Sequence, residues 1–299
     1  LEHPVRPSSY IEISNFYTTT IYEKGAEVVG MYRTLLGDDK FRQGTDLYFD
    51  RHDGQAATTD DFMQAMSEAG NVDLSQFERW YEQAGTPELR VTEDYQDGVL
   101  TLAIEQSCPA TPGQEQKAPF HMPVLLGLLD AAGAEIAISD GQVSSDAQTQ
   151  LRDKGRTVLL ELRDKVTQLV ISGLNDKPIV SFLRQFSAPV KVEYQRPGAE
   201  LGFLARNDQD GFVRWDALQT MWVSQFDQRS GVASSEPQDT LASIAQQALT
   251  LNVADEKLLA ASMLTVPSEL YLFEQLRGFD VDGLLDARDQ AVREAAIEN

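Results

Sequence analysis

Two tyrosines placed five residues apart are the side chains in this sequence best suited to chemistry. Tyr17 and Tyr22 lie in the threonine-rich stretch NFYTTTIYEKGA, directly before an apolar pattern of helical period. A neutral phenol can donate a hydrogen bond to a developing oxyanion, and removal of one such donor costs roughly 100- to 1000-fold in rate. A phenol ring can also form the wall of a side-chain pocket. The ordinary alternative is that each ring packs beside the helix with its hydroxyl at the surface.

Other groups that could bind metals lack the required spacing. The three histidines, His3, His52 and His121, lie far apart, and no HExxH motif is present. A single cysteine, Cys108, can form neither a zinc knuckle nor an intrachain disulfide. The stretch RNDQDGF (206–212) would place arginine and alanine at the first and last ligand positions of a calcium loop. We therefore predict no complete zinc site in this chain and a solvated turn at 206–212.

Composition excludes several classes of partner. The 299 residues suit two or three domains, and 47 acidic against 25 basic residues give a net charge of −22, which would repel nucleic acid. No apolar run approaches the ~18 residues of a membrane span, and no signal peptide is visible. The single cysteine fits a reducing compartment, or an envelope space in which disulfides are optional, so we expect a cytoplasmic location with envelope association left open. Because the sequence lacks an initiator methionine, we expect a fragment of a longer protein.

The elements that must position the tyrosines are helical. Apolar spacing predicts helices at about 22–36 and 38–51, with Gly37 between them. Thr58 with Asp61 predicts a capping box for a third helix that ends at Gly70. Asp73 with Gln76 predicts a second capping box for a fourth helix that ends at Gly85.

The period changes to that of strands between residues 88 and 194. ELRVTEDY and VLTLAIEQ flank QDG, which is typical of a β-hairpin, and PVLLGLLD and AEIAIS flank AAG. TVLLEL, TQLVIS, PIVSFL and PVKVEY complete a set that indicates an antiparallel β-sandwich. SSDAQTQ and SCPATPGQEQKAP are expected to be loops. Helical period returns over 198–228, and further helices are expected at about 240–251, 256–264, 268–276 and 282–296.

A long ordered stretch carries a family resemblance. HPVRPSSYIEISNFYTTTIYEKGAEVVGMYRTLLGDDKFRQGTDLYFDRHDGQAATTDDFMQAM, followed by FERWYEQAGTP, resembles the zinc-dependent metalloaminopeptidases of the aminopeptidase N family. The resemblance continues to FSAPVKVEY and to RND with RWDA, and it weakens from about residue 225. It implies the helical end of a thermolysin-like catalytic domain (1–86), an antiparallel β-sandwich (87–195) and the start of a C-terminal α-helical domain (196–299).

The same resemblance implies roles for both tyrosines. Tyr22 occupies the position that stabilises the tetrahedral intermediate of peptide hydrolysis, and Tyr17 the position that lines the pocket for the substrate's first side chain. In that family the HExxH zinc motif and the GxMEN signature precede the tyrosine motif, and neither occurs here. The resemblance thus implies peptide substrates and a zinc ion for the complete enzyme. For this chain it implies an inactive C-terminal portion whose helices at 20–85 expose apolar surface that the missing N-terminal half covers.

Two alternatives remain open from the sequence. The parent protein could be a non-catalytic relative in which the sandwich and helical domains serve binding or assembly. Without the resemblance, the sandwich could be a module that binds a carbohydrate or a protein. The strands carry no aromatic cluster, which argues against carbohydrate.

Overall fold

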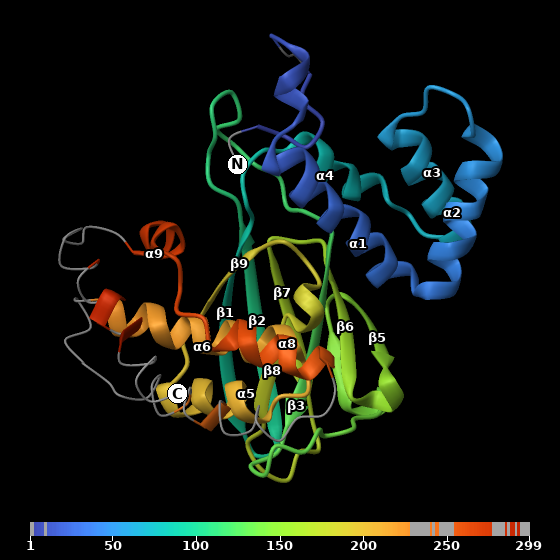
Figure 1. Ribbon diagram of the computed structural model, residues 1–299. Helices are drawn as coiled ribbons and strands as arrows, with labels where there is room; N and C mark the ends of the chain where they lie inside the picture. Colours follow the sequence, from blue (N-terminus) through green and yellow to red (C-terminus); the bar gives the residue numbers. More distant parts are fainter. Residues whose placement is uncertain are drawn as a thin grey trace. The chain divides into compact units, whose positions relative to one another are not determined.

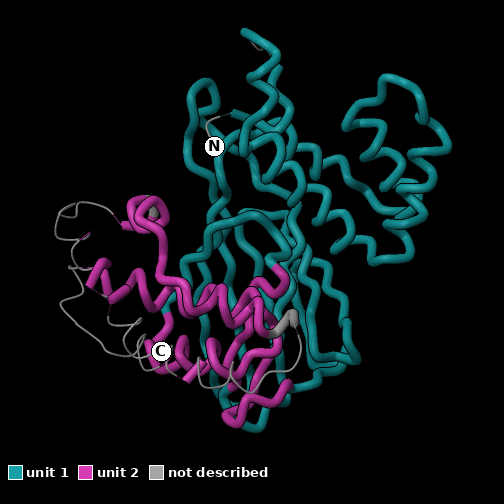
Figure 2. The backbone as a smooth tube through the Cα atoms, in the orientation of Figure 1, with its two compact units in different colours: residues 1–127, 136–177, 186–195 teal, residues 128–135, 178–185, 196–299 magenta. Residues whose placement is uncertain are grey.

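The chain forms two compact units (Figure 2). The computed structural model describes residues 3–8, 11–227, 240, 243–244, 254–276, 285, 288–290 and 292–293. Unit 1 comprises 1–127, 136–177 and 186–195, and unit 2 comprises 128–135, 178–185 and 196–299. Each unit has its own buried core.

Unit 1 begins with the predicted helices (Figure 1). After a 3-10 turn at Ile13–Phe16 and a π-helical turn at Thr20–Lys24, α1 spans Gly25–Leu36 and α2 spans Asp38–His52. Gly37 separates the two helices with a φ of 77°, a left-handed value that favours glycine. The buried face of α1 carries Val28, Met31, Tyr32 and Leu36, as the apolar spacing predicts.

The third predicted helix and its cap are confirmed. α3 spans Thr59–Gly70 and packs beside α2. The Thr58 hydroxyl accepts a hydrogen bond from the backbone N–H of Asp61 at 3.3 Å, and the Asp61 carboxylate accepts one from the backbone N–H of Thr58 at 2.8 Å. These reciprocal bonds satisfy two N–H groups that the first helical turn would leave without partners.

The second predicted capping box is wrong. The Asp73 carboxylate accepts a hydrogen bond from the backbone N–H of Ser75 at 2.9 Å, but the Gln76 side chain donates to the carbonyls of Pro119 and Arg163, at 3.1 and 2.6 Å. The glutamine thus binds sandwich loops distant in sequence instead of its local backbone. A 3-10 turn at Ser75–Glu78 and the single-turn helix α4 at Arg79–Glu82 take the place of one longer helix.

Substitution of two helical glycines by alanine should change the free energy of unfolding in opposite directions. A Cβ at Gly30 meets no atom within 4 Å, so Gly30→Ala should raise the free energy of unfolding by up to about 1 kcal/mol. A Cβ at Gly44 would lie 2.6 Å from Met66 Sδ and 3.3 Å from Met66 Cα, so Gly44→Ala should lower the free energy of unfolding. Urea titrations of the two variants beside the parent measure both changes. A shift in the same direction for both would contradict this packing.

The first sheet of the sandwich confirms the predicted hairpin. β1 (Glu88–Gln96) pairs antiparallel with β2 (Val99–Ser107) around Asp97 and Gly98, which both have positive φ as a tight hairpin turn requires. The strand order is β4-β7-β2-β1-β9, with β4 at Val143–Ser145, β7 at Val166–Ile171 and β9 at Lys191–Tyr194. β9 runs parallel to β1, so the sheet departs from the predicted antiparallel pairing at this edge.

The second sheet contains β5 (Gln148–Arg152), β6 (Thr157–Leu162) and β3 (Met122–Leu129) in that order, and unit 1 includes β3 as far as residue 127. Every residue of β3 is buried, which matches its continuous apolar sequence. Because β6 and β7 belong to different sheets, the segment at 163–165 passes from one layer of the sandwich to the other.

One strand prediction and one loop prediction in this region are wrong. Residues 134–139 form no strand, only a single bridge between Leu129 and Glu135. β4 and β5 occupy most of a polar stretch that was expected to be a loop. These are short, largely exposed strands at sheet edges, so no burial imposes an apolar alternation on their sequence.

Unit 2 is helical around its own core. α5 spans Gly198–Asn207, α6 Gly211–Phe226, α8 Ala254–Met263 and α9 Glu269–Gln275, beside β8 at Ile179–Phe182. These helices agree with the predicted period. The predicted helices at 240–251 and 282–296 lie largely outside the described residues. Among the described residues, no helix has the length and hydropathy of a membrane span.

The stretch 206–212 is not the solvated turn that the sequence suggests. Asp210 caps α6, because its carboxylate accepts hydrogen bonds from the backbone N–H groups of Val213 and Gln185, both at 3.0 Å. Asp208 is buried and accepts from the Asp210 N–H at 2.8 Å. The acidic residues here therefore organise a helix start.

Candidate functional site

The π-helical turn at Thr20–Lys24 places Tyr22 immediately before α1. Its start is held by Thr18, whose backbone carbonyl accepts hydrogen bonds from the N–H groups of Ile21 and Tyr22, at 3.1 and 3.0 Å. The Thr18 hydroxyl also accepts from the Ile21 N–H at 3.2 Å. Such single π turns are rare and occur often at functional sites, since they rotate a side chain relative to a regular α-helix.

The structure brings the two predicted site residues together. The rings of Tyr17 and Tyr22 stack with centroids 5.8 Å apart and an interplanar angle of 17°. Tyr17 is 71% exposed and Tyr22 is 56% exposed. Within the described part of the chain, neither hydroxyl is committed to a protein hydrogen bond, so both can reach an external partner.

A histidine supports the start of the turn. His3 Nδ1 lies 2.8 Å from the backbone carbonyl of Pro4, which can only accept, so Nδ1 carries the proton. His3 Nε2 then accepts from the Thr18 hydroxyl at 3.1 Å. This histidine therefore orients Thr18. Sequence analysis did not assign it a role, because its partner lies 15 residues away.

A buried lysine supports the end of the turn, and no pattern in the sequence predicts its burial. Lys24 is only 5% exposed. Its ammonium group donates to the backbone carbonyl of Gly85 at 2.8 Å and lies 5.6 Å from the centroid of the Trp80 ring. Burial lowers the pKa of Lys24 to about 8, an effect that Cys108 opposes and Lys117 reinforces. The helical turn thus presents Tyr22 on one side and buries a cation on the other.

The described residues do not form a zinc site. No group of three or more histidine, cysteine, aspartate or glutamate side chains has the geometry to hold a metal ion within the described ranges. His3 is engaged with Thr18, and His121 is buried with its Nε2 3.0 Å from the Glu161 carboxylate. The tyrosine turn offers two phenol hydroxyls that can donate hydrogen bonds.

Apolar side chains are exposed around the tyrosine turn and on α1 and α2. Ile11 and Ile13 precede the turn, Val29 lies on α1 and Phe49 on α2, and all four are exposed. The prediction that the missing part of a longer chain covers such surface concerns residues beyond this structure and stays a prediction.

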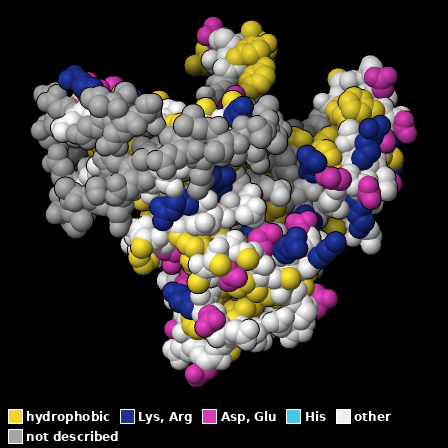
Figure 3. Space-filling model, turned by 60° about the horizontal axis from the view of Figure 1, so that its bottom comes forward, with side chains coloured by type: hydrophobic (Ala, Val, Ile, Leu, Met, Phe, Trp, Pro, Cys, Tyr) yellow, Lys and Arg dark blue, Asp and Glu magenta, His cyan; other side chains and the backbone are white. Residues whose placement is uncertain are grey.

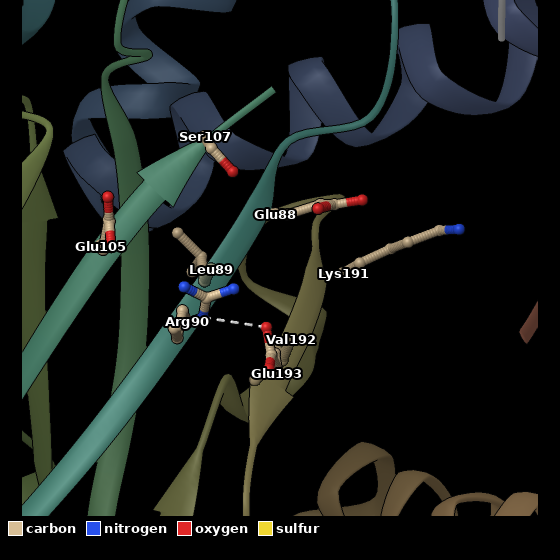
Figure 4. A pocket seen from close by; sticks show the side chains of 8 residues that line it. All are labelled: Glu88, Leu89, Arg90, Glu105, Ser107, Lys191, Val192 and Glu193. Carbon is tan, nitrogen blue, oxygen red and sulfur yellow. Dashed lines mark hydrogen bonds and ion pairs between the residues drawn. The ribbon is translucent and has the colours of Figure 1, made fainter. Parts of the chain in front are cut away.

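A second candidate is a groove on the first sheet (Figure 4). It has a volume of about 250 Å³ and is lined by side chains from β1, β2 and β9. Arg90 Nε and Glu193 Oε2 form an ion pair at 3.0 Å across it, while the Lys191 side chain extends away from the strands. The lining residues are Glu88, Leu89, Arg90, Glu105, Ser107, Lys191, Val192 and Glu193. This set holds no aromatic ring, and neither the Glu88 nor the Glu105 carboxylate is hydrogen-bonded to the Ser107 hydroxyl, so it offers neither sugar stacking nor an activated nucleophile.

The distribution of charge on the described surface does not indicate a binding face of one sign. On the face shown in Figure 3, basic and acidic side chains are interspersed rather than gathered by sign. Among the described residues on that face, this pattern offers no basic patch for a polyanion, and the net charge of the chain is −22.

Three family models match consecutive parts of the chain. Residues 2–81 match "Peptidase family M1 domain" and residues 85–195 match "Domain of unknown function (DUF3458) Ig-like fold". Residues 198–298 match "Domain of unknown function (DUF3458_C) ARM repeats". Aminopeptidase N of Escherichia coli strain K12 is 38% identical over 100% of this chain and 34% of its own length. The chain belongs to the aminopeptidase N family. The predicted fold class, a helical end of the catalytic domain followed by a sandwich and a helical domain, is confirmed with it.

A further relative and a solved structure extend this similarity. Aminopeptidase N of Caulobacter vibrioides is 38% identical over 99% of this chain and 33% of its own length. The crystal structure of Legionella pneumophila aminopeptidase A in complex with aspartic acid superposes with a TM-score of 0.80 at 25% identity, covering 99% of this chain and 32% of that one. The chain thus spans about a third of the length of the relatives it matches.

Proposed function

We propose that this chain is part of a zinc metalloaminopeptidase that removes N-terminal residues from peptides. The observation that carries this proposal is the exposed, stacked pair of Tyr17 and Tyr22 on a π-helical turn, in a segment that matches the peptidase family M1 domain. The sandwich and the helical region would serve as the domains at 87–195 and 196–299, after the catalytic segment at 1–86.

In this proposal Tyr22 is the oxyanion donor. As the peptide carbonyl becomes tetrahedral, its oxygen gains negative charge, and the neutral phenol donates a hydrogen bond that is stronger in the transition state than in the ground state. The open hydroxyl of Tyr22 allows this contact. Tyr17 stacks against Tyr22 and would form a wall of the pocket that holds the substrate's first side chain.

The zinc ion of the proposed enzyme would be bound outside this chain, because the described residues offer no ligand set for it. When bound, zinc supplies an activated water and polarises the scissile carbonyl. The contribution of this chain is to hold Tyr22 and Tyr17 at the site. The test is hydrolysis of alanyl-p-nitroanilide by the complete zinc-loaded protein. Absence of turnover would favour the alternative, a non-catalytic relative that uses these domains for binding or assembly.

The 299-residue chain by itself should be inactive. We expect no stoichiometric zinc after dialysis against the metal and no release of p-nitroaniline from alanyl-p-nitroanilide, since ligands and general base are missing. Metal analysis and the anilide assay measure the two outcomes, with the complete protein as the control. One bound zinc ion together with turnover in this chain would contradict the proposal.

A further inference from the structure

Lys24 is unusual because its side chain is buried. Its side chain is 5% exposed although it belongs to the same turn as the exposed Tyr22. Within the described ranges no carboxylate forms an ion pair with it. A buried ammonium group without a carboxylate partner is costly, so it persists where other contacts compensate.

The compensating contacts tie the turn to a buried part of unit 1. Lys24 Nζ donates to the Gly85 carbonyl at 2.8 Å, in the segment that connects α4 to β1. The same group lies 5.6 Å from the centroid of the Trp80 ring, within the range of a cation–π contact. Trp80 is itself fully buried, and its Nε1–H donates to the His121 carbonyl at 2.8 Å.

The contacts of Lys24 affect how the turn that carries Tyr22 is oriented. A π turn departs from the α-helical geometry that is far more common, so it persists where contacts at its ends hold it. The start of the turn is bonded to Thr18, and Lys24 is the last residue of the turn, two positions after Tyr22. The turn continues directly into α1, whose buried face fixes the helix, so loss of the Lys24 anchor would let the turn return to α-helical geometry. That change moves the Tyr22 hydroxyl.

We propose that Lys24 is a positioning residue that fixes the Tyr22 hydroxyl by anchoring the π turn to the Gly85 carbonyl and the Trp80 ring. This inference rests on the proposed function, because it concerns the donor of that site. Lys24 does not touch substrate; its effect passes through Tyr22. A displacement of a catalytic group by about 1 Å can cost roughly 100-fold in rate.

A double-mutant cycle in the complete enzyme tests this coupling. Lys24→Met retains the apolar stem and removes the ammonium group. Alone, it should lower kcat for alanyl-p-nitroanilide by roughly 10- to 100-fold with less than about a threefold change in KM. In the Tyr22→Phe background it should cause less than about a twofold further loss, because the group that it positions is already absent.

Lys40→Met is the matched control. Lys40 also donates to a glycine carbonyl in unit 1, that of Gly70 at 2.9 Å, but it lies on α2 away from the turn. Its kcat should equal that of the parent enzyme. If Lys24→Met yields no folded protein, Lys24→Gln, which keeps a donor without the charge, takes its place in the cycle.

The outcomes separate this inference from the proposed function. A full-rate Tyr22→Phe enzyme would remove Tyr22 from the mechanism and the inference with it. A slow Tyr22→Phe enzyme in which the lysine substitution causes an equal, independent loss would overturn only the inference. The inference would also fail if the lysine variant kept the parent kcat while Tyr22→Phe was slow.

Discussion

Replacing Tyr22 by phenylalanine in the complete enzyme should lower kcat for alanyl-p-nitroanilide by roughly 100- to 1000-fold. The substitution removes one hydroxyl from an exposed ring that stacks on Tyr17, so the fold and the stacking should be retained. Because the hydrogen bond forms to the developing oxyanion, KM should change little. Steady-state kinetics at equal zinc content measure the effect.

Tyr17→Phe is the control for the Tyr22 prediction. It also removes one hydroxyl from the same stacked pair, but it keeps the ring that forms the proposed pocket wall. Its kcat should therefore stay close to that of the parent. Equal losses in the two variants would show that the pair acts through general packing, and full rate in Tyr22→Phe would remove Tyr22 from the mechanism.

Replacing Trp80 by alanine should destabilise unit 1 by about 3–5 kcal/mol. Trp80 is completely buried in α4, its ring centroid lies 4.6 Å from that of Phe120, and its Nε1–H donates to the His121 carbonyl at 2.8 Å. The alanine variant loses the apolar burial, opens a cavity and leaves that buried carbonyl without its donor. Denaturant unfolding followed by circular dichroism measures the change.

Phe49→Ala is the matched control for the Trp80 prediction. It truncates an aromatic ring in the same unit, but Phe49 is largely exposed on α2. Its free energy of unfolding should stay within about 0.5 kcal/mol of the parent value. If Trp80→Ala changed the free energy of unfolding as little as Phe49→Ala, α4 would not be an integral part of the core of unit 1.

Features that depend on nearby residues could be predicted from the sequence. The helices α1, α2 and α3 follow from apolar spacing, and the α3 cap follows from Thr58 and Asp61, three positions apart. The hairpin around Asp97 and Gly98 follows from turn chemistry, because positive φ is needed there. The family resemblance singled out Tyr17 and Tyr22 but contained nothing about how they are held.

Contacts between residues distant in sequence escaped sequence analysis. The Gln76 side chain does not bond to its local backbone but donates to carbonyls 43 and 87 residues away. β9 pairs with β1 in parallel after the chain has crossed the sandwich. Short edge strands such as β4 and β5 carry no apolar alternation, because neither face is well buried.

The candidate site also combines features that the sequence indicates with features that only the tertiary structure reveals. Composition and motif determined which residues could act: two phenols before a helix, with no complete metal-binding motif. The tertiary structure decided that these rings stack, that Tyr22 sits on a π turn and that Lys24 turns inward to a carbonyl 61 residues away. The physical reason is that a local pattern specifies the period of an element. The partners that hold its ends belong to whichever distant segments the folded core brings beside it.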